Sequence, residues 1–287
     1  MKSERNDPFQ QMLNFPPVSK SEWVDLIERD LKGADYKQKL NWRTGEGFSI
    51  LPFFTREDLD AVEHDTSGPI VNDAGWGSLE PVHAADPSEA NRHIKKVRAE
   101  GIRSFYLRSE ASSVSGALGG DMEGTQIHEP SDLEKLLHGV DPDTDFLFNS
   151  GMSTPGLVAM LRNEDNEIKA SFIYDPFRFI AERGKWPLPQ DRYKRLLSEL
   201  SGLNGYRTLC ADVLFYHHCG ATIVQELGLM LATASEYLAD NENAEATASS
   251  FFTRMSAGPL YFPEIAKFRA ARLLWLRLLE AYGLDES

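Results

Sequence analysis

The order of apolar and polar positions predicts alternating strands and helices from about residue 75 onward. Short apolar runs such as 104–108 and 146–149 are typical of buried strands, while longer segments with apolar residues every three or four positions are typical of helices. The predicted strands are 78–82, 104–108, 146–149, 170–174 and 208–216, and the predicted helices are 88–100, 131–138 (capped by Ser131), 154–162, 189–200 and 221–238.

A further long helix is predicted from Pro263, because proline is tolerated in the first turn of a helix. Its apolar residues recur at helical spacing and predict one buried face, made of Ile265, Phe268, Ala271, Trp275 and Leu278. The cations of this helix are Lys267, Arg269, Arg272 and Arg277.

Strands separated by helices of this length indicate right-handed βαβ units and a parallel sheet. Five units are visible, and the helix from Pro263 belongs to a sixth. A closed (β/α)8 barrel has eight strands in roughly 250 residues, so a barrel-type fold here is apparently incomplete, with about five to six βα units. An open doubly wound sheet is the alternative, but no G-x-G-x-x-G follows the first strand, which disfavours nucleotide binding.

Residues 1–68 differ from the rest and are predicted to form an arm, with the main domain at 69–287. Ser19 and Glu22 have the spacing of a capping box, and the helix they open ends at Gly33. The aromatic segment 42–54 follows it and reads as extended chain. A helix and an extended segment bury themselves poorly, so we expect the arm to lie on the main domain or on a partner.

Composition narrows the class of protein. The net charge of -14, from 44 acidic and 30 basic residues, argues against a nucleic-acid or anionic-membrane surface. The polar N-terminal segment has no signal-peptide core, and only two cysteines are present. We therefore expect a cytoplasmic protein without a disulfide framework or a zinc site.

Three separated segments carry a family resemblance. The first is Asp30-Leu31-Lys32-Gly33 followed by the pattern W-x-T-x-E-G-F from Trp42 to Phe48. The second is FYHHCGATIVQELG at 215–228, and the third is FF…F-x-EIAKFRAAR-LW within 251–280. In this order they resemble the methylmalonyl-CoA mutase family.

The resemblance implies the barrel of a cobalamin-dependent mutase, which interconverts methylmalonyl-CoA and succinyl-CoA by a radical route. In such enzymes the cofactor supplies the chemistry and the barrel encloses the acyl-CoA. Some bacterial members are heterodimers of a catalytic large subunit and a related small subunit without the catalytic residues.

Single positions are expected to distinguish the two subunit types. Active members place a histidine before the [AC]-G-A segment, where it hydrogen-bonds the thioester carbonyl; Phe215 stands there and has no donor. Asn72 takes the place of a tyrosine near the reacting carbons, and Arg183 takes the place of an arginine that meets the substrate carboxylate. A surface role stays open for Arg183, and His217 and His218 are either compensating groups or polar residues of a turn.

The cobalt-ligating motif D-x-H-x-x-G is absent, and no cobalamin domain is predicted in this chain. We therefore expect no catalytic residues and no bound cofactor, with adenosylcobalamin held by a large-subunit partner. The favoured hypothesis is a non-catalytic small subunit of a heterodimeric mutase, which stabilises the large subunit. The alternatives are the acyl-CoA-binding catalytic half of a split mutase, or an acyl-CoA-binding module. Because the chain stops where further barrel strands should begin, we expect exposed sheet edges, in a fragment or in a chain completed by another subunit.

Overall fold

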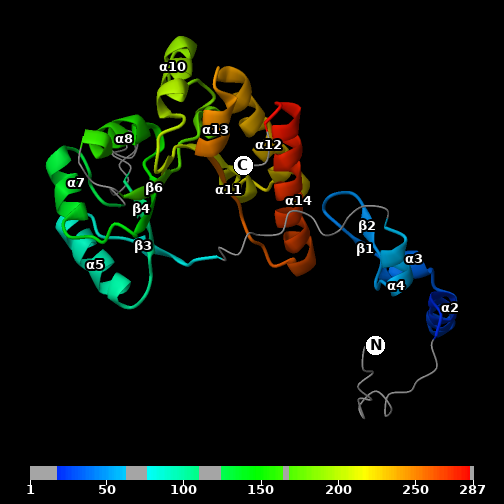
Figure 1. Cartoon of the computed structure of the whole chain (residues 1–287). Coiled ribbons are helices and arrows are strands. Elements are labelled where there is room, and N and C mark those ends of the chain that lie inside the picture. Colours follow the sequence, from blue (N-terminus) through cyan, green and yellow to red (C-terminus); the bar gives the residue numbers. More distant parts are fainter. Residues whose placement is uncertain (1–17, 63–75, 110–123, 164–167, 285–287) are drawn as a thin grey trace, which may run out of the picture. The chain divides into compact units, whose positions relative to one another are not determined.

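The computed structural model describes residues 18–62, 76–109, 124–163 and 168–284 (Figure 1). The chain divides into two units, residues 1–67 and 68–287, and each is described by itself. Asn72 lies outside the described residues, so its replacement of a catalytic tyrosine stays a prediction.

The first unit consists of short elements. Ser19 and Glu22 form the predicted capping box of α2, and Gly33 beyond its end has φ +89°. The predicted extended segment is a small antiparallel hairpin. The elements are α2 (Lys20–Asp30), α3 (Tyr36–Leu40), β1 (Trp42–Arg43), β2 (Ser49–Ile50) and α4 (Arg56–Asp60). None of residues 18–62 is buried, so the described part of this unit has no core of its own.

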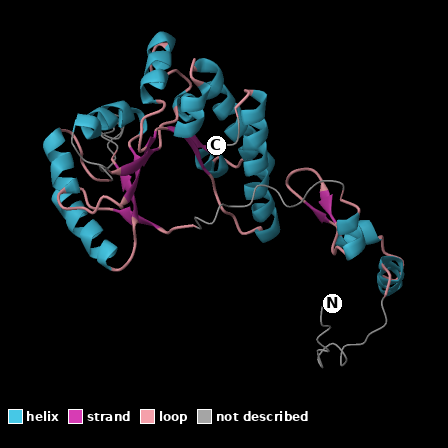
Figure 2. Cartoon of the chain, in the orientation of Figure 1, coloured by secondary structure: helices cyan, strands magenta, loops and turns pink. Residues whose placement is uncertain are grey.

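The second unit is built on parallel strands taken in chain order (Figure 2). One sheet contains β3 (Leu79–Val82), β4 (Ser104–Arg108), β5 (Asp145–Asn149), β6 (Lys169–Phe172) and β7 (Tyr206–Arg207). Thr208 separates β7 from β8 (Leu209–Asp212), which pairs in parallel with β9 (Phe251–Arg254). The Cys210 amide donates to the Tyr174 carbonyl at 3.2 Å, which continues the order from β6 to β8. The strands therefore fill six successive positions of a barrel-type sheet that does not close among the described residues.

Helices connect the strands and, in Figure 2, lie on the outer side of the curved strand layer. They are α5 (Pro87–Ala99), α7 (Pro130–Leu137), α8 (Thr154–Asn163), α9 (Pro176–Arg183), α10 (Gln190–Leu200), α11 (Val213–His218), α12 (Ile223–Asp240), α13 (Ala244–Ser250) and α14 (Tyr261–Ala281), with a 3-10 turn at Gly151–Ser153.

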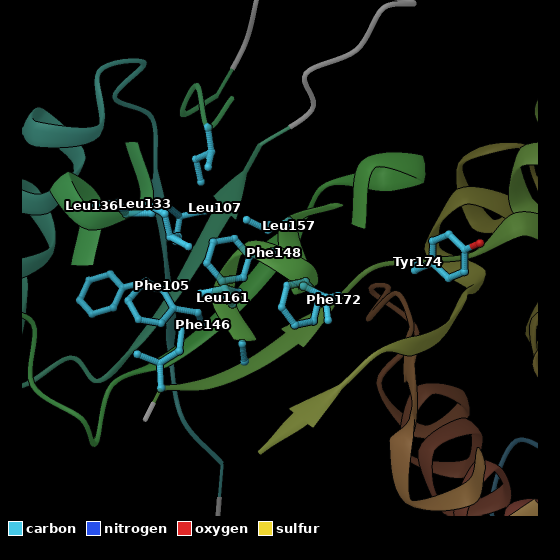
Figure 3. Packing of buried hydrophobic residues seen from close by; sticks show 14 of the residues in the cluster. Phe105, Leu107, Leu133, Leu136, Phe146, Phe148, Leu157, Leu161, Phe172 and Tyr174 are labelled. Atoms are coloured by element: carbon cyan, nitrogen blue, oxygen red, sulfur yellow. The ribbon is translucent and has the colours of Figure 1, made fainter. Parts of the chain in front are cut away.

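A ladder of aromatic rings fills the core between this sheet and the helices (Figure 3). Phe146 and Phe148, two positions apart on β5, point to the same face, and their ring centroids lie 5.6 Å apart. The Phe148 ring stacks in turn on Phe172 of β6 at 5.4 Å. Leu136 and Leu161, from α7 and α8, are fully buried in the same cluster. This core fixes the strands, and with them the position of the strand ends.

The predicted barrel-type α/β fold is confirmed, but several element predictions were wrong. The strand predicted at 208–216 ends at Asp212, and Val213–His218 is a helix, because a short apolar run does not distinguish the two states. The helix of the third family segment begins at Tyr261 instead of Pro263. The helix predicted to be capped by Ser131 has Glu129 as its N-cap.

The predicted buried face of α14 was also wrong in part. Ile265 is exposed, whereas Lys267 is fully buried. The helix packs against α12 through a face that contains buried charges, and apolar spacing alone does not reveal such a face. The buried residues are Glu264, Lys267, Ala271 and Leu279.

Candidate functional site

Two charged residues meet at the carboxyl ends of β8 and β9. Asp212 and Arg254 are the last residues of these strands and lie directly opposite each other in the register. The Arg254 Nε donates to Asp212 Oδ1 at 2.7 Å, and its second nitrogen donates to Oδ2 at 2.6 Å. Asp212 has no exposed surface, so a bidentate guanidinium–carboxylate pair is buried where ligands bind in parallel α/β folds.

A second arginine joins the same carboxylate from α9. Arg178 donates to Asp212 Oδ2 at 2.7 Å. Asp175, the N-cap of α9, accepts from the backbone amides of both Arg178 and Asp212 at 2.9 Å. The Arg178 guanidinium also lies 5.2 Å from the centroid of the Phe215 ring. We call Asp175, Arg178, Asp212, Phe215 and Arg254 the strand-end cluster.

Burial and pairing set the charges of this cluster. Burial lowers the pKa of Arg254, but the hydrogen bond and charge of Asp212 more than offset this, so the pKa is raised overall. Burial raises the pKa of Asp175 from 3.8 to about 6, against the lowering effect of the amides of Arg178 and Asp212. The two cations are therefore balanced by one carboxylate that both contact and by a second one nearby.

A second polar cluster connects α11, α12 and α14. The Lys267 ammonium lies 2.6 Å from Glu264 Oε2 and 3.3 Å from Glu226 Oε2, and it donates to the Ser256 carbonyl at 2.9 Å. Lys267 and Glu226 are 1% exposed. We call these residues, together with His217, the buried-lysine cluster. Because each charge has an opposite partner, the cluster ties the three helices together.

His217 is oriented by this cluster without forming a proton relay. Its Nδ1 lies 2.8 Å from Glu226 Oε1 and 3.1 Å from Ser256 Oγ. A Ser-His-acid relay needs the hydroxyl and the carboxylate on opposite ring nitrogens, and here both contact the same one. The geometry therefore supports positioning of the ring and gives no activated serine.

No group of three or more metal-ligating side chains occurs among the residues that the structure describes. Likewise, in the described ranges no helix has both the length and the apolar character needed to cross a membrane.

Comparison with known proteins places the chain in a family. The model of the methylmalonyl-CoA mutase family matches residues 107–287. The chain belongs to the methylmalonyl-CoA mutase family. The methylmalonyl-CoA mutase small subunit of Porphyromonas gingivalis is 32% identical and covers 94% of this chain, which in turn covers 45% of that subunit.

Other mutase subunits are similar over nearly the same region. The small subunit of Streptomyces virginiae is 26% identical over 95% of this chain and 47% of its own length. The large subunit of Porphyromonas gingivalis is 24% identical over 85% of this chain and 39% of its own length. The chain thus spans about half the length of the curated relatives it matches.

The family is cobalamin-dependent, and the strand-end cluster does not fit that cofactor. Both oxygens of Asp212 and three guanidinium nitrogens of Arg178 and Arg254 are engaged with one another. The histidine motif D-x-H-x-x-G is also missing from the sequence. We therefore assign no residue of this chain to cobalamin and derive no step through it.

The predicted site residues lie in different surroundings. Phe215 lies on α11, where it stacks with Arg178. His217 and His218 follow Phe215 on the same helix, about 200° and 300° around its axis, so the alternation expected for a strand does not apply. Arg183 lies in the last turn of α9, one-third exposed and 3.4 Å from Glu182, outside the strand-end cluster.

No pattern in the sequence indicated that Arg178, Asp212 and Arg254 come together. Their meeting depends on the β8–β9 register and on the cap of α9, neither of which is visible in residue spacing. The available signal was modest: Asp175 and Asp212 each lie at or just beyond the end of an apolar strand.

Proposed function

We propose that this chain serves as the small, non-catalytic subunit of a methylmalonyl-CoA mutase and stabilises a catalytic large subunit. The strand-end cluster carries the proposal. At the edge where a barrel enzyme holds its substrate, the Asp212 carboxylate and the guanidiniums of Arg178 and Arg254 are engaged with one another.

The residues at three family positions support a subunit that does not catalyse the isomerisation. Phe215 offers no hydrogen-bond donor to a thioester carbonyl, and its ring is engaged by Arg178. Asn72, in place of a tyrosine, and Arg183, in place of the carboxylate-binding arginine, enter the proposal from the family resemblance. Arg183 keeps a one-third exposed side chain that can still meet a carboxylate.

The arm supports association with a partner. Its described residues contain no buried side chain, yet they expose large apolar groups, which a stable protein usually covers. The exposed set is Val18, Trp23, Leu26, Trp42, Phe48, Leu51, Phe54, Leu59 and Val62. We infer that residues 1–68 contact the large subunit, while the partial barrel of 69–287 forms the body of the subunit.

The comparisons supply the kind of partner. In Porphyromonas gingivalis both a small and a large mutase subunit are similar to this chain. By this proposal the large subunit holds adenosylcobalamin and isomerises methylmalonyl-CoA and succinyl-CoA, and the complex acts in the cytoplasm.

Light scattering on a sizing column tests the association. We expect this chain and the large subunit from the same source to elute as a one-to-one complex. A matched arm variant, with Trp23 and Phe54 replaced by serine, should weaken the complex while leaving the second unit folded. Separate elution of the two wild-type chains would refute the proposal.

A split mutase is the second candidate function, in which this chain is the acyl-CoA-binding half. The observation in its favour is His217, whose ring is fixed by Glu226 and is 39% exposed at the side chain. Turnover of methylmalonyl-CoA by this chain with only a cobalamin-binding chain added would establish this alternative.

A further inference from the structure

The Asp212 carboxylate is bound in the way that proteins bind a carboxylate ligand. Arg254 contacts both oxygens through parallel hydrogen bonds of 2.7 and 2.6 Å, and Arg178 adds a third contact of 2.7 Å. A planar guanidinium fork matches both oxygens of a carboxylate at once, which a lysine does not. The carboxylate bound here belongs to the chain itself.

We propose that Arg178 and Arg254 form a receptor for small carboxylate anions and that Asp212 permanently occupies it. Removal of this one side-chain carboxylate should turn the strand ends into a binding site for acetate or a similar monocarboxylate. The inference rests on the proposed function in one respect: it explains how a non-catalytic chain fills the strand ends at which an active mutase would hold acyl-CoA. The receptor geometry stands independently of any partner.

The backbone of both arginines, and the Arg178 guanidinium, are held by contacts that do not involve the Asp212 carboxylate. Arg254 belongs to β9, whose backbone is paired with β8 along its whole length. Arg178 lies in the first turn of α9, where its backbone amide is capped by Asp175 and its guanidinium lies over Phe215. The receptor should therefore keep its arrangement when Asp212 is shortened.

The cluster also has a route to solvent. Asp212 is fully buried, but the side chains of Arg178 and Arg254 are 29% and 21% exposed. A small anion can thus approach along the guanidiniums into the volume that Asp212 leaves. Without Asp212, Arg178 keeps Glu182 at 3.9 Å, but Arg254 loses the carboxylate that its guanidinium contacts, which favours uptake of a replacement anion.

The test compares thermal unfolding of the full chain in sodium acetate and in sodium chloride at equal ionic strength. We expect the D212A variant to have a lower Tm than wild type in chloride. Acetate should raise that Tm by about 5 °C at roughly 100-fold excess over its Kd, and the rise should grow with the logarithm of the acetate concentration. Wild type should show no acetate-specific rise, because its receptor is occupied.

The double variant D212A/R254M is the matched control. It removes the fork together with its occupant, so acetate should have no specific effect on it. If D212A is obtained only unfolded, the same comparison is made on refolding yield, which should be higher in acetate than in chloride for D212A alone.

Equal behaviour of D212A in the two salts, in Tm or in refolding yield, would overturn the inference. So would an acetate effect of the same size in wild type or in the double variant. Neither result depends on association with a large subunit, so failure here is distinguishable from failure of the proposed function.

Discussion

At the scale of single residues, two of the most deeply buried charges of the described chain, Lys267 and Asp212, each meet opposite charges. Lys267 lies between Glu226 and Glu264, and Asp212 lies between two arginines. The sequence placed Phe215 and Arg183 through a family pattern. It gave no indication that Lys267 is buried, because a lysine at helical spacing is usually solvated.

Replacement of Lys267 by methionine should leave Glu226 and Glu264 without their cation. Breaking a buried pair in this way costs about 3–5 kcal/mol, and we expect a loss of that size in the free energy of unfolding measured with urea. Arg272→Met, at an exposed position of the same helix, should change it by less than about 0.5 kcal/mol. A loss below about 1 kcal/mol for K267M would contradict the buried-lysine cluster.

Asp175 should make stability depend on pH. Its pKa is raised from 3.8 to about 6 by burial, so the folded state holds the proton more tightly than the unfolded state. The stability from this protonation is full below pH 3.8 and is lost as pH rises through 6. Asparagine does not ionise, so the stability of D175N relative to wild type should rise between pH 4 and 7 by up to about 3 kcal/mol.

Asp132 provides a control, because its effect on the pH dependence of stability has the opposite sign. Its pKa is lowered, chiefly by the backbone hydrogen bond from His128. The D132N variant should therefore lose stability relative to wild type as pH rises over the acid range. Parallel pH curves for D175N and wild type in urea denaturation would contradict the assignment to Asp175.

At the scale of elements, strands and helices with a clear period were predicted within one or two residues. The failures concern short elements, for which the sequence pattern is too brief to decide between helix and strand. Helix α11 was read as strand because its short run of apolar and aromatic residues, VLFY, suits both states, and α9, α13 and β9 were not predicted at all. The strand-end cluster depends on these elements, so the site was less predictable than the sheet.

Gly124 should be among the least replaceable glycines of the described chain. It has φ +114°, and a Cβ there would lie 2.1 Å from the carbonyl oxygen of Arg108 at the end of β4. Gly101 has a similar φ of +103° but no atom within 4 Å of its Cβ position. We expect G101A to lose about 1–2 kcal/mol of unfolding free energy from backbone strain alone, and G124A to lose more. Equal losses in denaturant titrations would show that the close approach has no cost.

At the scale of the whole molecule, the two units differ in how much apolar surface they bury. The second unit has an extensive apolar core, whereas residues 18–62 bury no side chain. Patterning predicted the incomplete barrel-type sheet, and the division into an arm of residues 1–68 and a domain of 69–287 stays a prediction. Composition and patterning give no surface for the arm to contact, because a contact with another chain depends on that chain's residues as well.

Limited proteolysis should reveal this difference. Trypsin should cleave the isolated chain within residues 18–62 well before it cleaves the second unit, because exposed segments without a core open easily. The large subunit should slow that cleavage if the arm is part of the interface. Cleavage of both units at the same rate would contradict the division, and undiminished cleavage in the complex would remove the arm from the interface.

The central claim is that this chain supports catalysis without performing it. The most direct measurement is methylmalonyl-CoA turnover per large subunit in the reconstituted complex, comparing wild type with a variant whose His217 and His218 are both glutamine. We expect rates equal within about twofold, since neither ring is placed in the chemistry. A loss of tenfold or more in an intact complex, or turnover by this chain without the large subunit, would contradict it.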